Sequence, residues 1–338
     1  MDAQPDTVPR LSCVLPPSAD FPRLAAIAEQ LGYHRVWAFD SPALYGDVWV
    51  ALARAADATS RIGLATGVAV PFTRHPVVTA SAIATVYEIA PGRLACAFGT
   101  GYSAARALGR KPMTWDDLST YVVQVRGLLA GDTVEIDGAY CKMINSPGFG
   151  PPRPVNVELY LSPMGPKGFA ASRRHADGII VPGQSTVPDV EPGAWATIAM
   201  MVAGTVVSDS ESLDSERATA ALGPQIATGV HGMYEFGPQA LDGVPGGPQW
   251  RAELEAVPAD RRHLALHEGH LVAVTARDAA IVAAAGPSLR NRFWTGSAQE
   301  IRERFHMAGQ KGITEVVFNP SGPAVDDELT RFAQAIMK

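Results

Sequence analysis

The sequence predicts an α/β fold, a (β/α)8 TIM barrel with insertions, on three observations. Short apolar runs typical of strands alternate with amphipathic helical patterns along most of the chain, which indicates βα units and a parallel sheet. The number of these runs is close to eight, the number that closes naturally as a barrel. A length of 338 residues with 47% hydrophobic content suits one large core, so we expect residues 1–338 to form a single domain.

Each expected strand is short, apolar and bounded by turn residues. Helices are expected between most of the strands; for example, Leu24, Ile27, Ala28 and Leu31 recur at helical spacing and mark one apolar face. The expected strands are residues 11–15, 35–39, 62–70, 93–98, 158–162, 178–181, 198–207 and 314–318.

Two connections are too long for simple turns, and we expect them to be insertions at about residues 132–154 and 209–295. The first contains Asp137-Gly138, a favoured two-residue hairpin turn. The second contains at least two helical stretches and a Gly/Pro-rich segment, residues 236–248, which we expect to be a mobile lid. After it, Ser297 and Glu300 have the spacing of a capping box that opens the helix before the last strand.

Composition restricts the class of partner. The formal net charge of -6 is spread without a basic block, which argues against nucleic acid or an anionic membrane and favours a small-molecule substrate. Cys13, Cys96 and Cys141 form no C-x-x-C pair, so we expect reduced thiols in a cytoplasmic protein. The N-terminus lacks a signal pattern and no apolar run approaches the roughly 18 residues of a membrane helix, so we expect neither secretion nor membrane spanning.

The most informative stretch is residues 159–168, where an apolar strand runs through a Gly/Pro-punctuated turn into a helix. Pro166 fits the first helical position, and the free amide groups of Met164, Gly165, Lys167 and Gly168 could face an anion. Lys167 adds a positive charge. The pattern therefore predicts phosphate binding, while an ordinary strand-to-helix turn remains the alternative.

Two other strand ends carry unusual residues. The strand at 62–70 contains Gly67, and glycine inside a strand often marks a bulge or the close approach of a ligand. A flat ring packed against backbone at Gly67-Val68 needs an absent side chain, and a non-prolyl cis peptide or a simple bulge would fit there. Asp40 ends the second strand, with Ser41 beside it; the pair either contacts a cofactor ring or substrate proton, or serves as a turn or helix cap.

Gly99, Gly101 and Ala104 match the looser G-x-G-x-x-A form of the dinucleotide fingerprint. No acidic residue ends a strand about 20 positions later, since Asp116 and Asp117 instead open a predicted helix. A doubly wound nicotinamide-binding domain is therefore the weaker alternative. The barrel places these glycines at the ligand face.

The histidines leave several interpretations open. His263, His267 and His270 are spaced i, i+4, i+7, which would align them on one helical face. Gly269 weakens that helix and no fourth ligand is evident, so we predict no metal site. Lining of a pocket and a packed or solvated cluster both remain possible, and His231 is similarly undecided.

Taken together, these residues resemble the bacterial luciferase-like oxidoreductases, which use flavin mononucleotide (FMN) or the 5-deazaflavin coenzyme F-420. The resemblance spans most of the chain. It is carried by residues 32–40, 66–68, 73–76, 99–101, 162–167 and 175–178, and by Gly296-Ser297 with Glu300.

The resemblance implies a TIM barrel with insertions, a non-prolyl cis peptide at Gly67-Val68 under the cofactor ring, and a homodimer paired through barrel helices. It also implies that the cofactor phosphate is held by Ser162, Met164, Gly165, Pro166 and Lys167. Many relatives carry a histidine directly after the acidic residue of the second strand, where this chain has Ser41.

We therefore expect an oxidoreductase whose bound F-420 or FMN carries hydride to or from a small organic substrate. A flavin monooxygenase using molecular oxygen and a cofactor-binding protein without turnover are the alternatives. Asp40 and Ser41 are the expected catalytic residues. The other expected cofactor-binding residues are Thr66, Gly67, Val68 and Ala69, which would support the ring, together with Gly99 and Thr100. The expected substrate residues are Tyr102, Met113, Trp115, His231, His267 and His270.

Overall fold

The computed structural model describes residues 8–183 and 190–337. Within these residues, eight parallel strands close into a barrel, because β8 pairs with β9 at the seam as well as with β7. This confirms the predicted fold class. The strands, in barrel order, are β9 (Thr197–Val206), β11 (Glu315–Asn319), β1 (Arg10–Leu15), β2 (Arg35–Ala38), β3 (Gly63–Ala69), β4 (Leu94–Phe98), β7 (Glu158–Leu161) and β8 (Gly178–Pro182).

All eight expected strands are present, with ends that differ from the predicted ones by at most one residue. The structure adds β10 (Trp294–Gly296), which the sequence analysis did not predict. β10 pairs in parallel with the last residues of β9, opposite Gly204 to Val206. The long strand β9 therefore pairs with β8 and β11 in the barrel and, through its last residues, with β10 after the second insertion.

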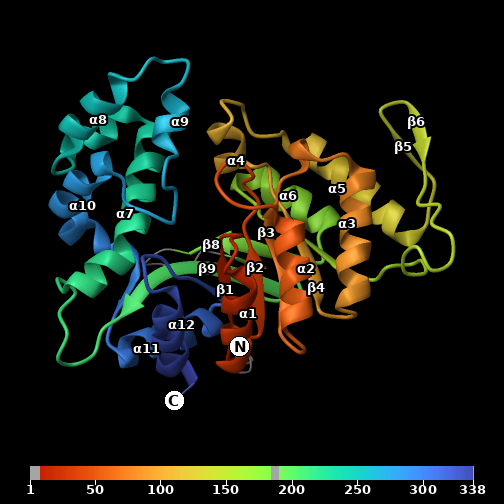
Figure 1. The fold of residues 1–338 in the computed structure, drawn as a ribbon, viewed down its shortest axis with the longest axis horizontal. Coiled ribbons are helices and arrows are strands. Elements are labelled where there is room, and N and C mark those ends of the chain that lie inside the picture. Colours follow the sequence, from red (N-terminus) through yellow and green to blue (C-terminus); the bar gives the residue numbers. More distant parts are fainter. Residues whose placement is uncertain (1–7, 184–189, 338) are drawn as a thin grey trace.

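Helices surround the barrel, as Figure 1 shows. Asp47 caps α2 by accepting hydrogen bonds from the backbone N–H groups of Trp49 and Val50. The predicted capping box of Ser297 and Glu300 is confirmed at the start of α11. The helices around the barrel are α1 (Phe21–Gln30), α2 (Val48–Ala58), α3 (Pro76–Ile89), α4 (Tyr102–Ala107), α5 (Trp115–Ala130), α6 (Gly165–His175), α11 (Ala298–Gln310) and α12 (Val325–Met337).

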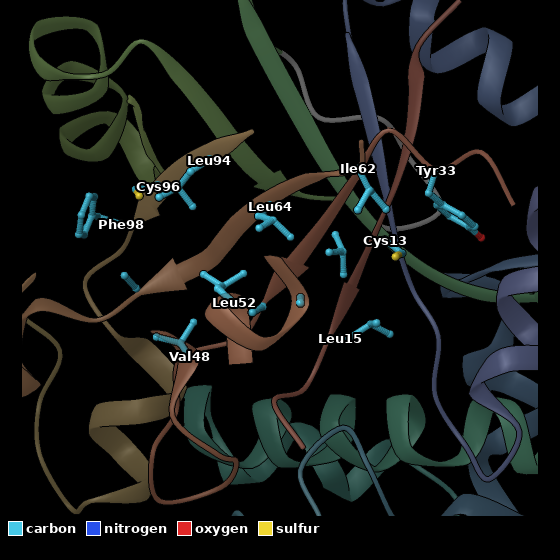
Figure 2. Packing of buried hydrophobic residues seen from close by; sticks show 14 of the residues in the cluster. Cys13, Leu15, Tyr33, Val48, Leu52, Ile62, Leu64, Leu94, Cys96 and Phe98 are labelled. Carbon is cyan, nitrogen blue, oxygen red and sulfur yellow. The ribbon is translucent and has the colours of Figure 1, made fainter. Parts of the chain in front are cut away.

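The core has two layers, because successive strand residues point to opposite faces of the sheet. One layer fills the barrel and includes Val14, Trp37 and Tyr160. The other lies between strands and helices; Figure 2 shows part of it, including Leu15, Leu52 and the two buried free cysteines Cys13 and Cys96. A closed, packed barrel fixes the strand ends on which the site depends.

The first long connection contains a two-stranded antiparallel hairpin, β5 (Val134–Ile136) and β6 (Ala139–Cys141). Its turn is Asp137-Gly138 with φ of 51° and 79°, which confirms the predicted hairpin turn. Figure 1 shows this hairpin projecting from the barrel.

The second long connection contains helices, as predicted: α7 (Glu216–Phe236), α8 (Gly247–Glu255), α9 (Arg262–Leu266) and α10 (Ala276–Leu289). They are grouped on the opposite side from the hairpin in Figure 1 and share a separate hydrophobic cluster around Ile226, Trp250 and Leu254. The expected lid at 236–248 forms a 3-10 turn, Pro238–Gly243, whose Leu241 is fully buried in that cluster. This anchoring argues against a freely moving lid.

Among the described residues, no helix combines the length and apolar character that crossing a membrane requires.

Candidate active site

A cavity of about 200 Å³ lies at the C-terminal ends of β2, β3, β4 and β7. This is the face of a TIM barrel at which ligands bind and chemistry takes place. Ten of the expected site residues line it: Asp40, Ser41, Gly67, Val68, Gly99, Thr100, Tyr102, Ser162, Met164 and His270. The lining also includes Gly101 and Ala104 of the G-x-G-x-x-A pattern, and five residues that were not predicted from the sequence: Phe39, Tyr45, Val70, Ser103 and Leu271.

Asp40 follows β2 and is 4% exposed. Its Oδ2 accepts hydrogen bonds from the backbone N–H of Val70 at 2.9 Å and from Arg74 Nη1 at 2.8 Å. Its Oδ1 is buried without a hydrogen-bond partner among the described residues. Burial raises the pKa of Asp40, although the charge of Arg74 and the two hydrogen bonds oppose this. One carboxylate oxygen is thus fixed, and the other is left without a hydrogen bond in a residue that lines the cavity.

Arg74 is the site residue whose role the sequence analysis missed. Its guanidinium joins Asp40 to Asp47, with Nη2 2.7 Å from Asp47 Oδ2. These three residues come from the β2–α2 and β3–α3 connections, 34 and 27 positions apart in the chain. The only available signal was the run Thr73-Arg74-His75-Pro76, and spacing alone did not indicate which carboxylate Arg74 would meet.

Glycines form one wall of the cavity. The peptide Gly67-Val68 is cis, as the resemblance implied, and the register between β3 and β4 shifts between Thr66 and Ala69. A Cβ atom on Gly99 would lie 2.6 Å from Val68 Cγ2, so a side chain there would collide with the neighbouring strand end. The backbone is therefore exposed to any flat ring that enters the cavity.

Thr66 and Ala69 are buried beside this wall and do not line the cavity. The Oγ1 of Thr66 donates to the carbonyl oxygen of Ala97 at 2.7 Å and so joins β3 to β4. Thr66 to Ala69 were expected to support the ring; of these four residues, Gly67 and Val68 line the cavity.

The turn after β4 depends on Gly101, which has φ +79° and precedes α4. A Cβ there would meet Val70 and would lie 2.8 Å from Phe72 Cε1. The G-x-G pattern thus lies on the rim of a barrel, and the dinucleotide-binding doubly wound fold is excluded.

The N-terminus of α6 lies at the edge of the cavity, since Ser162 and Met164 belong to the lining. Met164 is the N-cap residue, and its side chain makes no capping hydrogen bond. Gly165 has φ +64°, with open space where a Cβ would stand, and Pro166 and Lys167 are exposed. Free helix N–H groups beside a lysine are suited to an anion such as phosphate.

Tyr102 and His270 complete the lining from α4 and from the second insertion. The ring of Tyr102 lies between that of Phe236, at a centroid distance of 5.5 Å, and the guanidinium of Arg106 at 4.4 Å. Arg106 in turn lies 3.7 Å from Glu235. The insertion therefore contributes directly to the wall of the cavity.

Four expected substrate residues lie away from the lining. The N–H of Met113 donates to the carbonyl oxygen of Thr100, and Trp115 packs against Gly168, where an added Cβ would lie 2.7 Å from its ring. His231 is buried with its Nε2 3.1 Å from Asp278 Oδ1, and His267 is buried with its Nε2 3.2 Å from Glu235 Oε1.

The expected single helical face of histidines is wrong. Helix α9 ends at Leu266, and the chain turns at Gly269, which has φ +71°. Only His270 of this group reaches the cavity lining.

The features that face the cavity fit a cofactor with a flat ring and a phosphate-bearing tail. They are the partnerless Oδ1 of Asp40, the glycine wall at Gly67 and Gly99, and the uncapped N-terminus of α6. The ring would lie against the glycine wall, and the phosphate would lie at Met164 to Lys167.

Comparison with known proteins agrees with this arrangement. The model of the luciferase-like monooxygenase family matches residues 3–315. The chain is 34% identical over 167 residues to a 5,10-methylenetetrahydromethanopterin reductase of Methanolobus tindarius, covering 46% of this chain and 48% of that protein. It is 30% identical over 174 residues to an F-420-dependent hydroxymycolic acid dehydrogenase of Mycobacterium tuberculosis, covering 46% and 47%. The matched region thus spans about half the length of these curated relatives.

Among solved structures, the chain is similar to the coenzyme F-420-dependent tetrahydromethanopterin reductase of Methanopyrus kandleri, with a TM-score of 0.67. The alignment covers 98% of this chain and 99% of that chain at 20% identity. At that identity the similarity concerns the fold.

Proposed function

The chain belongs to the luciferase-like monooxygenase family, and we propose that it is an oxidoreductase that binds coenzyme F-420 and transfers hydride to or from a small organic substrate. Two observations support the choice of F-420 over FMN: one curated relative is named as F-420-dependent, and so is the solved structure with a similar fold. The observation that carries the assignment of the site is the partnerless, buried Oδ1 of Asp40 beside a glycine wall and an uncapped helix N-terminus.

The coenzyme, when bound, supplies the hydride chemistry, and the chain supplies position and charge. Val70 and Arg74 fix Oδ2 of Asp40, which leaves Oδ1 as the atom that can hold or exchange a proton with the substrate. Burial raises the pKa of Asp40, which brings the proton-bearing form closer to neutral pH. Ser41 and Tyr102 line the same cavity and orient the substrate.

The test is a matched pair of variants, Asp40→Asn and Asp47→Asn. Both residues contact Arg74, but only Asp40 lines the cavity, and the side chain of Asp47 is 45% exposed. Removing the proton-exchanging group is expected to lower F-420-dependent turnover by about 100-fold in Asp40→Asn. Asp47→Asn, which keeps a good helix cap, should stay within threefold of the wild type. Full turnover in Asp40→Asn would show that Asp40 is not catalytic.

A second candidate function is a flavin monooxygenase, which the description of the matching family favours. It requires reduced flavin and molecular oxygen. Oxygen consumption that depends on reduced FMN and on an organic substrate distinguishes it from hydride transfer with F-420, which consumes no oxygen.

We also infer that the chain acts as a single domain in a cytoplasmic homodimer. The buried free thiols of Cys13 and Cys96 support a reducing compartment. Size-exclusion chromatography with light scattering tests the dimer and should give twice the chain mass of 35.7 kDa; the mass of a single chain would contradict it.

A further inference from the structure

His270 stands out among the lining residues because one nitrogen of its ring is not used within the fold. It is 9% exposed and lines the cavity, and its Nδ1 is buried without a hydrogen-bond partner in the described part of the chain. An imidazole nitrogen left unpaired in the interior carries a desolvation cost that a ligand can relieve.

The backbone holds His270 in place from two sides. Its carbonyl oxygen accepts a hydrogen bond from the hydroxyl of Tyr45 at 2.7 Å, which ties it to the β2–α2 connection. The next residue, Leu271, has its N–H bound to Thr228 Oγ1 of α7 at 3.1 Å. Leu271 has φ +62°, a conformation that non-glycine residues rarely adopt and that clusters at ligand sites. The backbone position of His270 is therefore set by the barrel and by the insertion together.

Buried groups surround the ring. The His267 ring lies edge-on at a centroid distance of 5.6 Å, and behind it the Nε2 of His267 lies 3.2 Å from Glu235. Burial first, and then the nearby rings of His267 and His231, lower the pKa of His270 to about 3. His270 is therefore neutral at physiological pH and offers one hydrogen-bond donor and one acceptor.

A neutral imidazole matches some ligand groups better than others. A hydroxyl group can donate to it or accept from it, and a carbonyl oxygen can accept from it, without an unbalanced charge, whereas the imidazole offers no charge to compensate a carboxylate, a phosphate or an ammonium group. The cavity lining also includes the neutral hydrogen-bonding side chains of Ser41 and Tyr102.

We propose that His270 is a specificity-determining residue whose side chain hydrogen-bonds to the hydroxyl or carbonyl oxygen of the substrate. This inference rests on the proposed F-420-dependent function and adds the class of substrate group that the insertion recognises. His270 is not the proton carrier; that role stays with Asp40.

The experiment compares His270→Gln and His270→Asn with the control His263→Gln, which changes a half-buried histidine of the same insertion outside the cavity lining. Dissociation constants for F-420 are measured first, without substrate. Turnover is then measured with a panel of aliphatic and aromatic alcohols, aldehydes and ketones. Side-chain nuclear magnetic resonance of the F-420-loaded, ¹⁵N-histidine-labelled protein gives a readout that does not depend on turnover.

We expect both His270 variants to raise KM at least tenfold for the best compound of the panel, with the dissociation constant for F-420 within twofold of the wild type. His263→Gln should leave both values unchanged. The His270 signal should have the pattern of a neutral imidazole from pH 5 to pH 8 and should shift when that compound is added.

Two results would overturn the inference while leaving the proposed function intact: an unchanged KM in both folded His270 variants, or F-420 binding by a wild type that turns over none of the panel. Failure of the wild type to bind F-420 would instead remove the proposed function on which the inference rests.

Discussion

At the scale of single residues, two carboxylates show how burial and hydrogen bonds shift the pKa of the same group in opposite directions. Asp40 is buried with one oxygen partnerless, and its pKa is raised. Glu29 of α1 accepts hydrogen bonds from the successive backbone N–H groups of Ser60, Arg61 and Ile62, at 3.0, 2.6 and 2.8 Å. Partial burial acts to raise the pKa of Glu29, but these hydrogen bonds outweigh it and lower the pKa. Asp40 is arranged to meet a ligand, and Glu29 is arranged to stabilise the turn before β3.

Replacement of Glu29 should therefore destabilise the fold. Glu29→Gln is expected to cost about 1–2 kcal/mol in free energy of unfolding at pH 7, because charge-assisted hydrogen bonds to three N–H groups are weakened. The folded-state pKa lies below the ordinary value of 4.5, so this stabilisation is present above that pH and is lost as the pH falls through the folded-state pKa.

Urea unfolding at pH 7 and at lower pH tests this expectation, with Glu88→Gln on the exposed surface of α3 as the control. The difference between Glu29→Gln and the wild type should shrink as the pH drops below 4.5. A difference that stays constant with pH would show that the charge of Glu29 is not the cause.

Single site residues were predictable from sequence where they lie at strand ends. Asp40 and Gly99 follow or end an apolar run and Gly67 lies near the end of one, and parallel strands bring such positions to one rim. The pairing of Arg74 with Asp40 was not predictable, because it joins two connections. Trp115 was predicted to line the substrate space, but it packs against Gly168 and does not line the cavity.

At the scale of elements, the turn between β4 and α4 shows how a glycine shapes the cavity. Gly101→Ala is expected to cost about 2–4 kcal/mol, because alanine is disfavoured at φ +79° and its Cβ would collide with Val70 and Phe72. Gly92→Ala is the matched control, since Gly92 has φ +73° but nothing within 4 Å of an added Cβ. It should cost about 1–2 kcal/mol for the backbone alone. Thermal unfolding measures both variants. Equal losses of unfolding free energy in Gly101→Ala and Gly92→Ala would show that the collision with Val70 and Phe72 contributes nothing.

The N-terminus of α6 gives a second prediction at this scale. If it holds the cofactor phosphate, Lys167→Ala should weaken F-420 binding about two- to fivefold at low salt and less at high salt, since an exposed charge near a helix terminus is screened. Lys142→Ala, which removes an exposed lysine just after the β5–β6 hairpin, should leave the affinity unchanged. Fluorescence titration at two salt concentrations measures both. Equal affinities of the wild type and Lys167→Ala for F-420 would contradict a phosphate site at the N-terminus of α6.

Strands with a clear apolar pattern were predictable from the sequence, whereas a short strand was not. The eight barrel strands were found because each is an apolar run bounded by turn residues. Strand β10 was missed because it has three residues and forms only through the extension of β9. The histidine spacing suggested one helix, but Gly269 takes a positive φ and the chain turns there.

At the scale of the whole molecule, the cavity is built by two parts of the chain. The barrel supplies Asp40, the glycine wall and the α6 terminus, while the helical insertion supplies His270 and Leu271. Contacts between Tyr45 and His270, and between Tyr102 and Phe236, join the two parts. The barrel could be predicted from local sequence patterns. The contacts of the insertion with the barrel could not, because they join residues that are far apart in the sequence.

The central claim is that this cavity binds coenzyme F-420. The most direct test is a fluorescence titration of the purified protein with F-420 and, in parallel, with FMN, each in its oxidised and reduced states. We predict saturable binding of F-420 at one site per chain, with FMN bound at least tenfold more weakly. Selective binding of FMN would contradict the assignment of F-420 and favour the monooxygenase, and binding of neither would contradict the cofactor site itself.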